Sequence, residues 1–259
     1  MLTRQPDLTM VLPTYNERDR LKELVTSLFG SAGAAGIVLE LVVVDDNSPD
    51  GTGAIADELA THHRMRVIHR AAKLGLGTAV VAGFDAASAD VVGVMDADFS
   101  HPPSLVPKML LVFAATKADC LVASRYVPGG STPNWPFGRR LLSRVGCWLA
   151  RPLSPIRDAA SGFFLIRRSI AQSVTIKAGG FKICLELIVR AQPGKLVEIP
   201  YRFDDRELGE SKMNKREAAG YLVQLRDLYG LRFTGARRPR EYEQLTASRV
   251  DELTRRKRS

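Results

Sequence analysis

Cysteine is scarce in this sequence. Its 259 residues include three cysteines, Cys120, Cys147 and Cys184, and no two of them are near enough to form a CxxC pair. An odd count at wide spacing argues against a disulfide framework and against a zinc knuckle. We expect reduced thiols, as is usual in a cytoplasmic compartment.

Long apolar runs are also missing. The sequence has no stretch of about 18 consecutive apolar residues, the length that a membrane-spanning helix requires. Its first residues, MLTRQPDLTMVLPTYNE, contain no apolar run long enough for a signal peptide. We therefore expect no transmembrane segment, and any contact with a membrane should be peripheral.

Acidic residues are outnumbered by basic ones. Lys and Arg total 37 and Asp and Glu total 28, which gives a formal net charge of +9. Such a balance favours anionic partners: nucleic acid, membrane headgroups or phosphorylated substrates. The sequence contains no basic helix-turn-helix, RNP aromatic pair or zinc knuckle. A non-enzymatic basic protein that binds nucleic acid is therefore the less favoured alternative.

Apolar runs and amphipathic segments alternate along the first half of the chain. Strands are predicted at 8–12, 38–44, 67–69, 91–95 and 120–124. Helices are predicted between them at 17–29, 52–62, 78–87 and 105–115. This alternation predicts an α/β fold with a mostly parallel sheet and helices on both faces. Further on, strands at 162–167 and 196–203 flank a helical segment at 185–191.

Acidic side chains follow three of the predicted strands. They are Glu17, Asp45, Asp46, Asp96 and Asp98. The carboxyl ends of parallel strands share one edge of a sheet, where ligands bind in open α/β folds. Asp96 and Asp98 are two residues apart, so extended backbone aims both toward one side. Hard oxygen ligands of this kind suit Mg²⁺ or Mn²⁺, with water and substrate phosphates completing the shell. The alternative is a set of solvated turn carboxylates.

Asp46 suggests a different task. A carboxylate after the second strand of such a sheet commonly accepts a hydrogen bond from a nucleotide base or ribose. The alternative is an Asx-turn with Asn47 and Ser48. Both interpretations hold together if Asp45 serves the turn and Asp46 the ligand. The nearby Gly75-Leu76-Gly77 lacks the third glycine of a dinucleotide-binding loop and predicts a tight turn before a helix.

The segment 139–151 has the pattern of a basic amphipathic helix. At about 100° per residue, one face collects Leu141, Leu142, Val145, Trp148 and Leu149, and another collects Arg140, Arg144 and Arg151. A basic helix with Trp on its apolar side is typical of the interface of anionic lipid. We expect Trp135 and Phe137 to extend the insertion. The alternative is an ordinary surface helix whose apolar face lies in the core.

Six motifs together resemble one family. They are VLPTYNE, VVDDNSPDGT, KLGLGTA, MDADFSHPP, SRY and DRELGESKM, in this order between residue 8 and about residue 230. The combination resembles the family 2 glycosyltransferases of GT-A fold. More narrowly, it resembles the dolichol-phosphate (polyprenol-phosphate) mannose synthases. The resemblance implies a Rossmann-like, mostly parallel sheet.

The resemblance also implies roles for individual residues. Pro13, Tyr15 and Glu17 would line the nucleotide pocket, and Val44 and Asp46 would hold the guanosine. Asp96, Ala97, Asp98 and Ser100 would form the metal and diphosphate site. Arg125, Arg206 and Lys212 would contact phosphates. Separately, from the charge and pattern of segment 139–151, we expect Arg139, Ser143, Leu142 and Trp148 to receive the phosphate and lipid of the acceptor. Asp158, Ser161 and Glu186 would lie near the sugar.

The implied reaction is the inverting transfer of mannose from GDP-mannose to a polyprenyl monophosphate. The product, a polyprenyl-phosphate-mannose, would serve as a lipid-linked sugar donor. The alternative is a glucosyltransferase that uses UDP-glucose with the same lipid. The expected location is peripheral, on the cytoplasmic face of the membrane, and some relatives pair with a membrane-embedded partner protein. Residues 1–235 would form the catalytic domain, and residues 236–259 a basic, flexible C-terminal tail.

Overall fold

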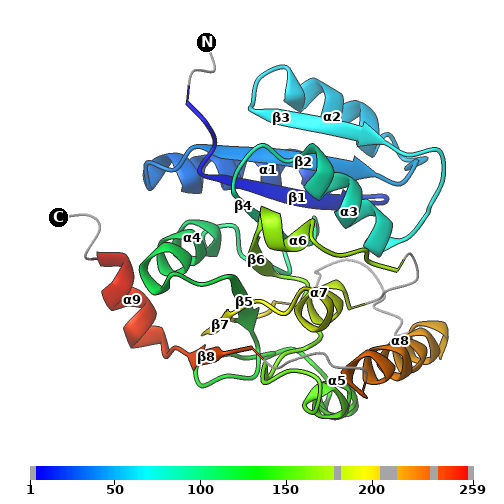
Figure 1. Ribbon diagram of the computed structural model, residues 1–259. Coiled ribbons are helices and arrows are strands. Elements are labelled where there is room, and N and C mark those ends of the chain that lie inside the picture. Colours follow the sequence, from blue (N-terminus) through cyan, green and yellow to red (C-terminus); the bar gives the residue numbers. More distant parts are fainter. Residues whose placement is uncertain (1–3, 178–181, 205–214, 234–238, 256–259) are drawn as a thin grey trace.

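The structure is a computed structural model that describes residues 4–177, 182–204, 215–233 and 239–255 (Figure 1). Its strands are β1 (Leu8–Thr14), β2 (Leu39–Asp45), β3 (Met65–His69), β4 (Val91–Val94), β5 (Cys120–Ser124), β6 (Phe164–Arg167), β7 (Lys195–Pro200) and β8 (Glu241–Gln244). Its helices are α1 (Arg18–Ala34), α2 (Thr52–Ala60), α3 (Leu76–Ala86), α4 (Leu105–Thr116), α5 (Phe137–Ala150), α6 (Arg168–Ala171), α7 (Ile183–Ala191), α8 (Lys215–Phe233) and α9 (Ala247–Arg255).

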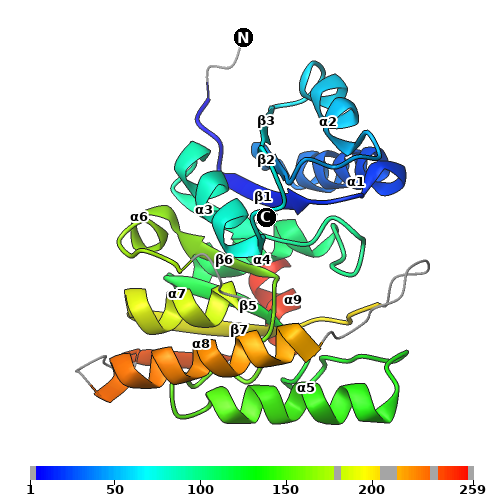
Figure 2. The same cartoon turned by 90° about the vertical axis from the view of Figure 1, so that its right-hand side faces the viewer.

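One mostly parallel sheet organises the chain. The strand order is β3-β2-β1-β4-β6-β5-β7-β8. Only β6 runs against its neighbours among these strands, because it pairs antiparallel with both β4 and β5. The predicted α/β architecture is confirmed, and helices cover both faces of the sheet (Figures 1 and 2).

Each face of the sheet has its own apolar core. Along β1, Leu8, Met10 and Leu12 pack into one core, while Val11 packs into the other. Alternate residues of a strand point to opposite faces, so a strand buried on both faces reads as a continuous apolar run. This is why the apolar runs in the sequence locate β1, β2, β4 and β5.

The register brings three strand ends to one edge. Thr14, the last residue of β1, pairs with Asp45, the last residue of β2. Val94, the last residue of β4, pairs with Val11 on the other side of β1. The loops after β1, β2 and β4 therefore leave the sheet side by side, as the sequence predicts.

The C-terminal segment differs from the expectation. Residues 241–255 form β8 and α9 rather than an unpacked tail. β8 extends the sheet by pairing in parallel with β7, and Leu245 and Val250 are buried in the core beside α4. Asp251 of α9 adds an ion pair of 3.0 Å with Lys108 of α4. The tail looked unpacked in the sequence because an edge strand depends on main-chain hydrogen bonds, which need no apolar run.

Within the described residues, every helix is too short or too polar to span a lipid bilayer.

Candidate active site

The loop after β1 is anchored to the loop after β2. The backbone N–H of Glu17 donates to Thr52 Oγ1 (2.9 Å), and that of Arg18 donates to the Asp50 carboxylate (3.2 Å). These amides lie at the start of α1, where the first N–H groups of a helix have no partner within the helix. The β2–α2 loop supplies the acceptors, so the PTYNE and DDNSPDGT motifs form one unit.

Asp45 serves the turn. Its carboxylate accepts hydrogen bonds from Thr14 Oγ1 (3.0 Å), from Ser48 Oγ (2.6 Å) and from the Ser48 backbone N–H (3.0 Å). Asp45 is buried and closes an Asx-type turn. This leaves Asp46, the next residue, as the candidate for a ligand.

Asp46 connects the end of β2 to the start of α3. Its carboxylate forms an ion pair of 2.7 Å with Arg70 and lies 3.3 Å from the backbone N of Gly75. Arg70 also donates to the carbonyl oxygen of Gly75 (3.1 Å) and to Thr78 Oγ1. Gly75 has a φ of +95° and immediately precedes α3. The predicted tight turn before a helix is confirmed, and it lies beside Asp46.

The other nucleotide-pocket candidates differ in exposure. Tyr15 is exposed, and the Nζ of Lys73 lies 3.7 Å from the centre of its ring. Pro13 and Glu17 are half-buried. Val44 is fully buried in the core, so only its backbone is in a position to face a nucleotide.

The two acids of the DAD turn have different surroundings. The Asp96 side chain is 42% exposed, whereas Asp98 is buried. Asp98 Oδ1 accepts hydrogen bonds from the backbone N (3.0 Å) and the Oγ (2.6 Å) of Ser100. Arg20 of α1 donates to the carbonyl oxygen of Asp98 (2.9 Å). Ala97 is buried between the two acids.

Sequence reasoning missed His101. Its Nδ1 accepts the backbone N–H of Asp96 (3.0 Å), and its ring stacks on Phe163 at 4.8 Å and lies edge-on to Tyr201 at 5.9 Å. Burial lowers the pKa of His101, although the charges of Asp96 and Asp98 oppose this, so the ring is held neutral. The signal was present in MDADFSHPP, as the one imidazole beside the two carboxylates. His101 fixes the direction in which Asp96 leaves the sheet.

The donor set fits a hard divalent cation. Asp96 offers an exposed carboxylate, and Asp98 and Ser100 offer further oxygens in the same turn. Over the described ranges, no three His, Cys, Asp or Glu side chains converge as a protein-only metal cage. Mg²⁺ and Mn²⁺ sites of nucleotide-dependent enzymes commonly use one or two carboxylates and take their remaining ligands from water and phosphates.

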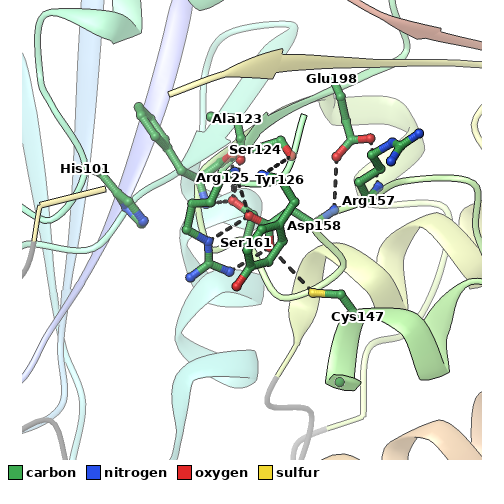
Figure 3. A network of polar contacts seen from close by, with 12 residues as sticks. His101, Ala123, Ser124, Arg125, Tyr126, Cys147, Arg157, Asp158, Ser161 and Glu198 are labelled. Carbon is green, nitrogen blue, oxygen red and sulfur yellow. Dashed lines mark hydrogen bonds and ion pairs between the residues drawn. The ribbon is translucent and has the colours of Figure 1, made fainter. Parts of the chain in front are cut away.

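Arg125 and Asp158 form a buried pair (Figure 3). Arg125 donates through Nε (2.7 Å) and Nη2 (2.6 Å) to the two oxygens of Asp158, and its backbone N donates to the same carboxylate (2.9 Å). Burial alone would lower the pKa of Arg125, but the charge of Asp158 and the hydrogen bonds to it raise that pKa above its usual value. Asp158 is fully buried and both of its oxygens bind Arg125, so it has a structural partner in addition to the sugar contact expected of it.

Two more residues expected near the sugar have structural partners. Ser161 Oγ donates to the carbonyl oxygen of Ala123 (2.7 Å). The buried carboxylate of Glu186 accepts from Arg190 Nε (2.8 Å) and from Gln224 Nε2 (2.9 Å), which ties α7 to α8. Arg206 and Lys212, the two further cations expected at the phosphates, lie outside the described residues.

Helix α5 presents its apolar side chains to solvent. Phe137, Leu141, Leu142, Val145 and Trp148 are exposed, Trp148 by 70%. The alternative, an apolar face in the core, is therefore wrong for these side chains. Two tyrosines of α8 hold α5, because Tyr221 donates to the carbonyl oxygen of Gly146 (2.8 Å) and Tyr229 to that of Leu149 (2.6 Å).

The expectation that Trp135 enters lipid is wrong. Trp135 is buried, lies edge-on to Phe203 at 5.3 Å, and has the guanidinium carbon of Arg139 4.0 Å from its ring centre. Its aromatic partner comes from just after β7, a contact that the local sequence does not reveal. Ser143, on α5, is half-buried.

Comparison with known proteins agrees with this geometry. The model of glycosyl transferase family 2 matches residues 9–185. The chain belongs to the family 2 glycosyltransferases, and its sheet is of the GT-A type.

Individual relatives within this family show which of its members the chain resembles. The chain is 41% identical over 224 residues to a polyprenol monophosphomannose synthase of Mycolicibacterium smegmatis, with 81% of this chain and 83% of that protein covered. It is 40% identical over 219 residues to a dolichol-phosphate mannosyltransferase of Pyrococcus furiosus, which covers 83% of this chain but 61% of that longer protein. The resemblance to dolichol-phosphate and polyprenol-phosphate mannose synthases is confirmed.

Solved structures share the fold. A mannosyltransferase from Pyrobaculum calidifontis in complex with GDP-Man and Mn²⁺ superposes with a TM-score of 0.60 at 17% identity, covering 92% of this chain and 67% of that one. Mannosyl-3-phosphoglycerate synthase from Rubrobacter xylanophilus superposes with a TM-score of 0.63 at 19% identity, covering 87% and 75%.

Proposed function

We propose that this glycosyltransferase moves mannose from GDP-mannose to the phosphate of a polyprenyl monophosphate. The observation that carries the proposal is the convergence of the Asp46 loop and the DAD turn at one sheet edge, in a chain about 40% identical to enzymes named for that transfer. Tyr15 and Asp46 would contact the guanosine, and the Asp96–Asp98 turn would face the diphosphate. Mg²⁺ or Mn²⁺ held there would offset the charge that develops on the departing GDP.

The acceptor needs little help from a base. The second pKa of a phosphomonoester is about 6, so the attacking oxygen is already ionised near neutral pH. The difficulty lies in bringing two anions together, which costs Coulomb energy unless cations lie between them. Arg125 and Arg139 among the described residues, together with Arg206 and Lys212, would supply these cations. Direct attack opposite the leaving group would give a β-linked mannose from the α-linked donor.

The lipid part of the acceptor requires an apolar surface. Helix α8, which is hydrogen-bonded to α5, also exposes apolar side chains, namely Leu222 and Val223. We name this set of seven residues the apolar ridge: Phe137, Leu141, Leu142, Val145, Trp148, Leu222 and Val223. Figures 1 and 2 both place α5 beside α8. The ridge would rest in the outer part of the bilayer, with Arg140, Arg144 and Arg151 near anionic headgroups, on the cytoplasmic face. A membrane-embedded partner protein could share that location.

A donor competition tests the proposal. The purified chain is incubated with Mn²⁺, a polyprenyl phosphate in detergent, and either radiolabelled GDP-mannose or radiolabelled UDP-glucose. We expect label from GDP-mannose to enter the organic phase, in a product whose anomeric carbon is β by NMR. Transfer from UDP-glucose alone would reject the assigned donor. Label transferred only to water would reject the assigned acceptor.

A further inference from the structure

The C-terminal strand β8 is linked to the Arg125–Asp158 pair through the hydroxyl group of Tyr242 and the carboxylate of Glu198. Tyr242 of β8 donates its phenol hydrogen to the carboxylate of Glu198 on β7, and Gln244 Nε2 in turn donates to the Tyr242 oxygen. The parallel pairing of the two strands sets these contacts, because Leu196 aligns with Tyr242 and Glu198 with Gln244. Neither Glu198 nor Tyr242 lies in residues 9–185, the segment that matches the family model.

Glu198 is fully buried and holds the loop that carries Asp158. Its two oxygens accept the backbone N–H groups of Arg157 (2.8 Å) and Asp158 (3.1 Å). Burial raises the pKa of Glu198, while the hydrogen bonds from Tyr242 and from the two amides lower it. The side chain of Ser124 is a further donor to Glu198. A buried carboxylate is costly unless donors surround it, so these four donors and Glu198 stabilise one another.

Asp158, whose backbone is held by Glu198, in turn fixes the position of the Arg125 side chain. Each oxygen of Asp158 accepts one N–H of the guanidinium, at 2.6 and 2.7 Å, in a two-point contact that fixes the plane of the group (Figure 3). A guanidinium has five N–H donors, so three of them lie outside this pair. The direction in which those three point depends on where Asp158 is held.

We propose that Tyr242 and Glu198 are positioning residues, which hold Asp158 in place and thereby aim the guanidinium of Arg125 at the phosphates of the substrates. The inference rests on the proposed function for the identity of those phosphates. Its physical basis is that a planar donor group stabilises an anion well only from a fixed direction. The C-terminal strand is then part of the active-site support, although it lies outside the matched family segment.

The first test uses Tyr242→Phe in the full chain, which removes one hydroxyl and keeps the ring. We expect kcat for mannosyl transfer to fall about tenfold and the KM for GDP-mannose to stay within about twofold. Assays are run well below the melting temperature of the variant. The matched control is Glu243→Gln, because Glu243 belongs to the same strand, has a side chain that is 43% exposed, and forms an ion pair of 3.6 Å with Lys195. We expect wild-type rates from the control.

The second test measures the hydrogen exchange of the Arg125 guanidinium in the absence of substrate. In protein labelled with ¹⁵N-arginine, the Nε–H of Arg125 should exchange slowly with water, because Asp158 accepts it in a buried site. The Nε–H resonance of Arg125 is assigned as the one that is missing from the spectrum of the Arg125→Lys variant. In Tyr242→Phe, and more strongly in Glu198→Gln, we expect this exchange to be at least about tenfold faster.

The outcomes of these two tests distinguish the positioning role of Tyr242 and Glu198 from the proposed mannosyltransferase function. A lower melting temperature with unchanged kcat and unchanged Arg125 exchange would overturn the inference, since Tyr242 would then stabilise the fold only. A fall in kcat with unchanged exchange would overturn it as well. Faster exchange in a protein that transfers no mannose would support the positioning role and reject the proposed function.

Discussion

Asp46 and Arg70 form an ion pair of 2.7 Å at the end of β2, and both side chains are less than a tenth exposed. Arg70 also donates to the carbonyl oxygen of Gly75, so the pair joins the end of β2 to the start of α3. The carboxylate therefore has a structural partner in addition to any nucleotide that it contacts. A single substitution at Asp46 affects both, and the two effects have to be separated.

Asp46→Asn should weaken both folding and donor binding. The free energy of unfolding should fall by about 3 kcal/mol, because the substitution leaves Arg70 buried without its anion. The KM for GDP-mannose should rise about tenfold if the carboxylate accepts hydrogen bonds from the ribose or base. In Asp46→Asn/Arg70→Met the stranded charge is gone, so stability should recover in part while the KM stays high. A KM that returns to normal in the double variant would show that Asp46 acts through the fold alone.

Asp96 is a cleaner test of the metal site than Asp98. The side chain of Asp98 holds Ser100 in the turn, so Asp98→Ala also removes a structural contact. Asp96 is 42% exposed, and its turn is held through its backbone N–H instead. Asp96→Asn should lower kcat at least about 100-fold and change the melting temperature by no more than about 2 °C. EDTA should abolish wild-type activity and Mn²⁺ should restore it. Full activity in EDTA would contradict the metal site.

Asp50 should make stability depend on pH. Burial raises its pKa, but hydrogen bonds from the side chain and backbone of Thr52 and from the backbone N–H of Arg18 together outweigh burial and lower the pKa below the ordinary 3.8. As pH falls, the unfolded chain is protonated at Asp50 before the folded chain. The stabilisation is therefore complete above pH 3.8 and is lost as pH falls through the folded pKa.

Asp50→Asn tests this sign. Urea midpoints are measured for both proteins between pH 3 and pH 7. We expect the variant to have the lower midpoint at pH 5 to 7, and the gap between the two proteins to close below pH 3.8. A gap that is constant across the whole range would mean that the Asp50 carboxylate is not preferentially ionised in the folded state.

The strand ends were predictable from sequence because their signal is local. An apolar, β-branched run that stops at a pair of acids identifies a buried parallel strand and the edge at which it ends. Asp46 and Asp96 lie at one edge of the sheet because β2 and β4 both run parallel to β1, and the strand order places them on either side of it. Asp45 as the turn residue was also within reach, since its hydroxyl partner Ser48 is three positions away.

The remaining contacts depend on residues that are distant in the chain. Arg125 and Asp158 are 33 positions apart, and Glu198 and Tyr242 are 44 apart. The hydrophobic periodicity of the sequence does not indicate which buried basic residue pairs with which acidic residue from a distant segment. The antiparallel direction of β6 could not be predicted either, because the short apolar run Phe164–Arg167 carries no signal for the direction of the strand. His101 was missed because Phe163 and Tyr201, which bury it, come from other strands or their ends.

The apolar ridge should control membrane binding rather than donor binding. Leu142→Ser/Trp148→Ser removes two exposed apolar side chains, so pelleting with vesicles that contain anionic lipid should weaken about tenfold or more. GDP-mannose binding should be unchanged. The control is Leu74→Ser, since Leu74 is about as exposed as Leu142 but comes just before α3, which Figures 1 and 2 show apart from α5. Equal pelleting of wild type and double variant would reject the ridge as the membrane contact.

Gly83 tests how closely α3 packs on the sheet. A Cβ at Gly83 would lie 2.3 Å from Cγ1 of Val11, a fully buried residue of β1. Gly83→Ala should therefore destabilise the protein by about 1–3 kcal/mol, despite the helical preference of alanine. Gly30→Ala in α1 meets nothing within 4 Å and should stabilise by about 0.5–1 kcal/mol.

Val11→Ala should rescue Gly83→Ala. The shortened side chain at position 11 makes room for the new methyl group, and the methyl group fills part of the cavity left on β1. The loss in the double variant should be smaller than the sum of the two single losses by about 1 kcal/mol or more. Urea unfolding of the four proteins measures this coupling. Additive losses would mean that α3 moves away from β1 rather than clashing with Val11. In that case the Asp46–Arg70 pair, which joins the start of α3 to β2, the strand next to β1, should weaken too, and Gly83→Ala should raise the KM for GDP-mannose.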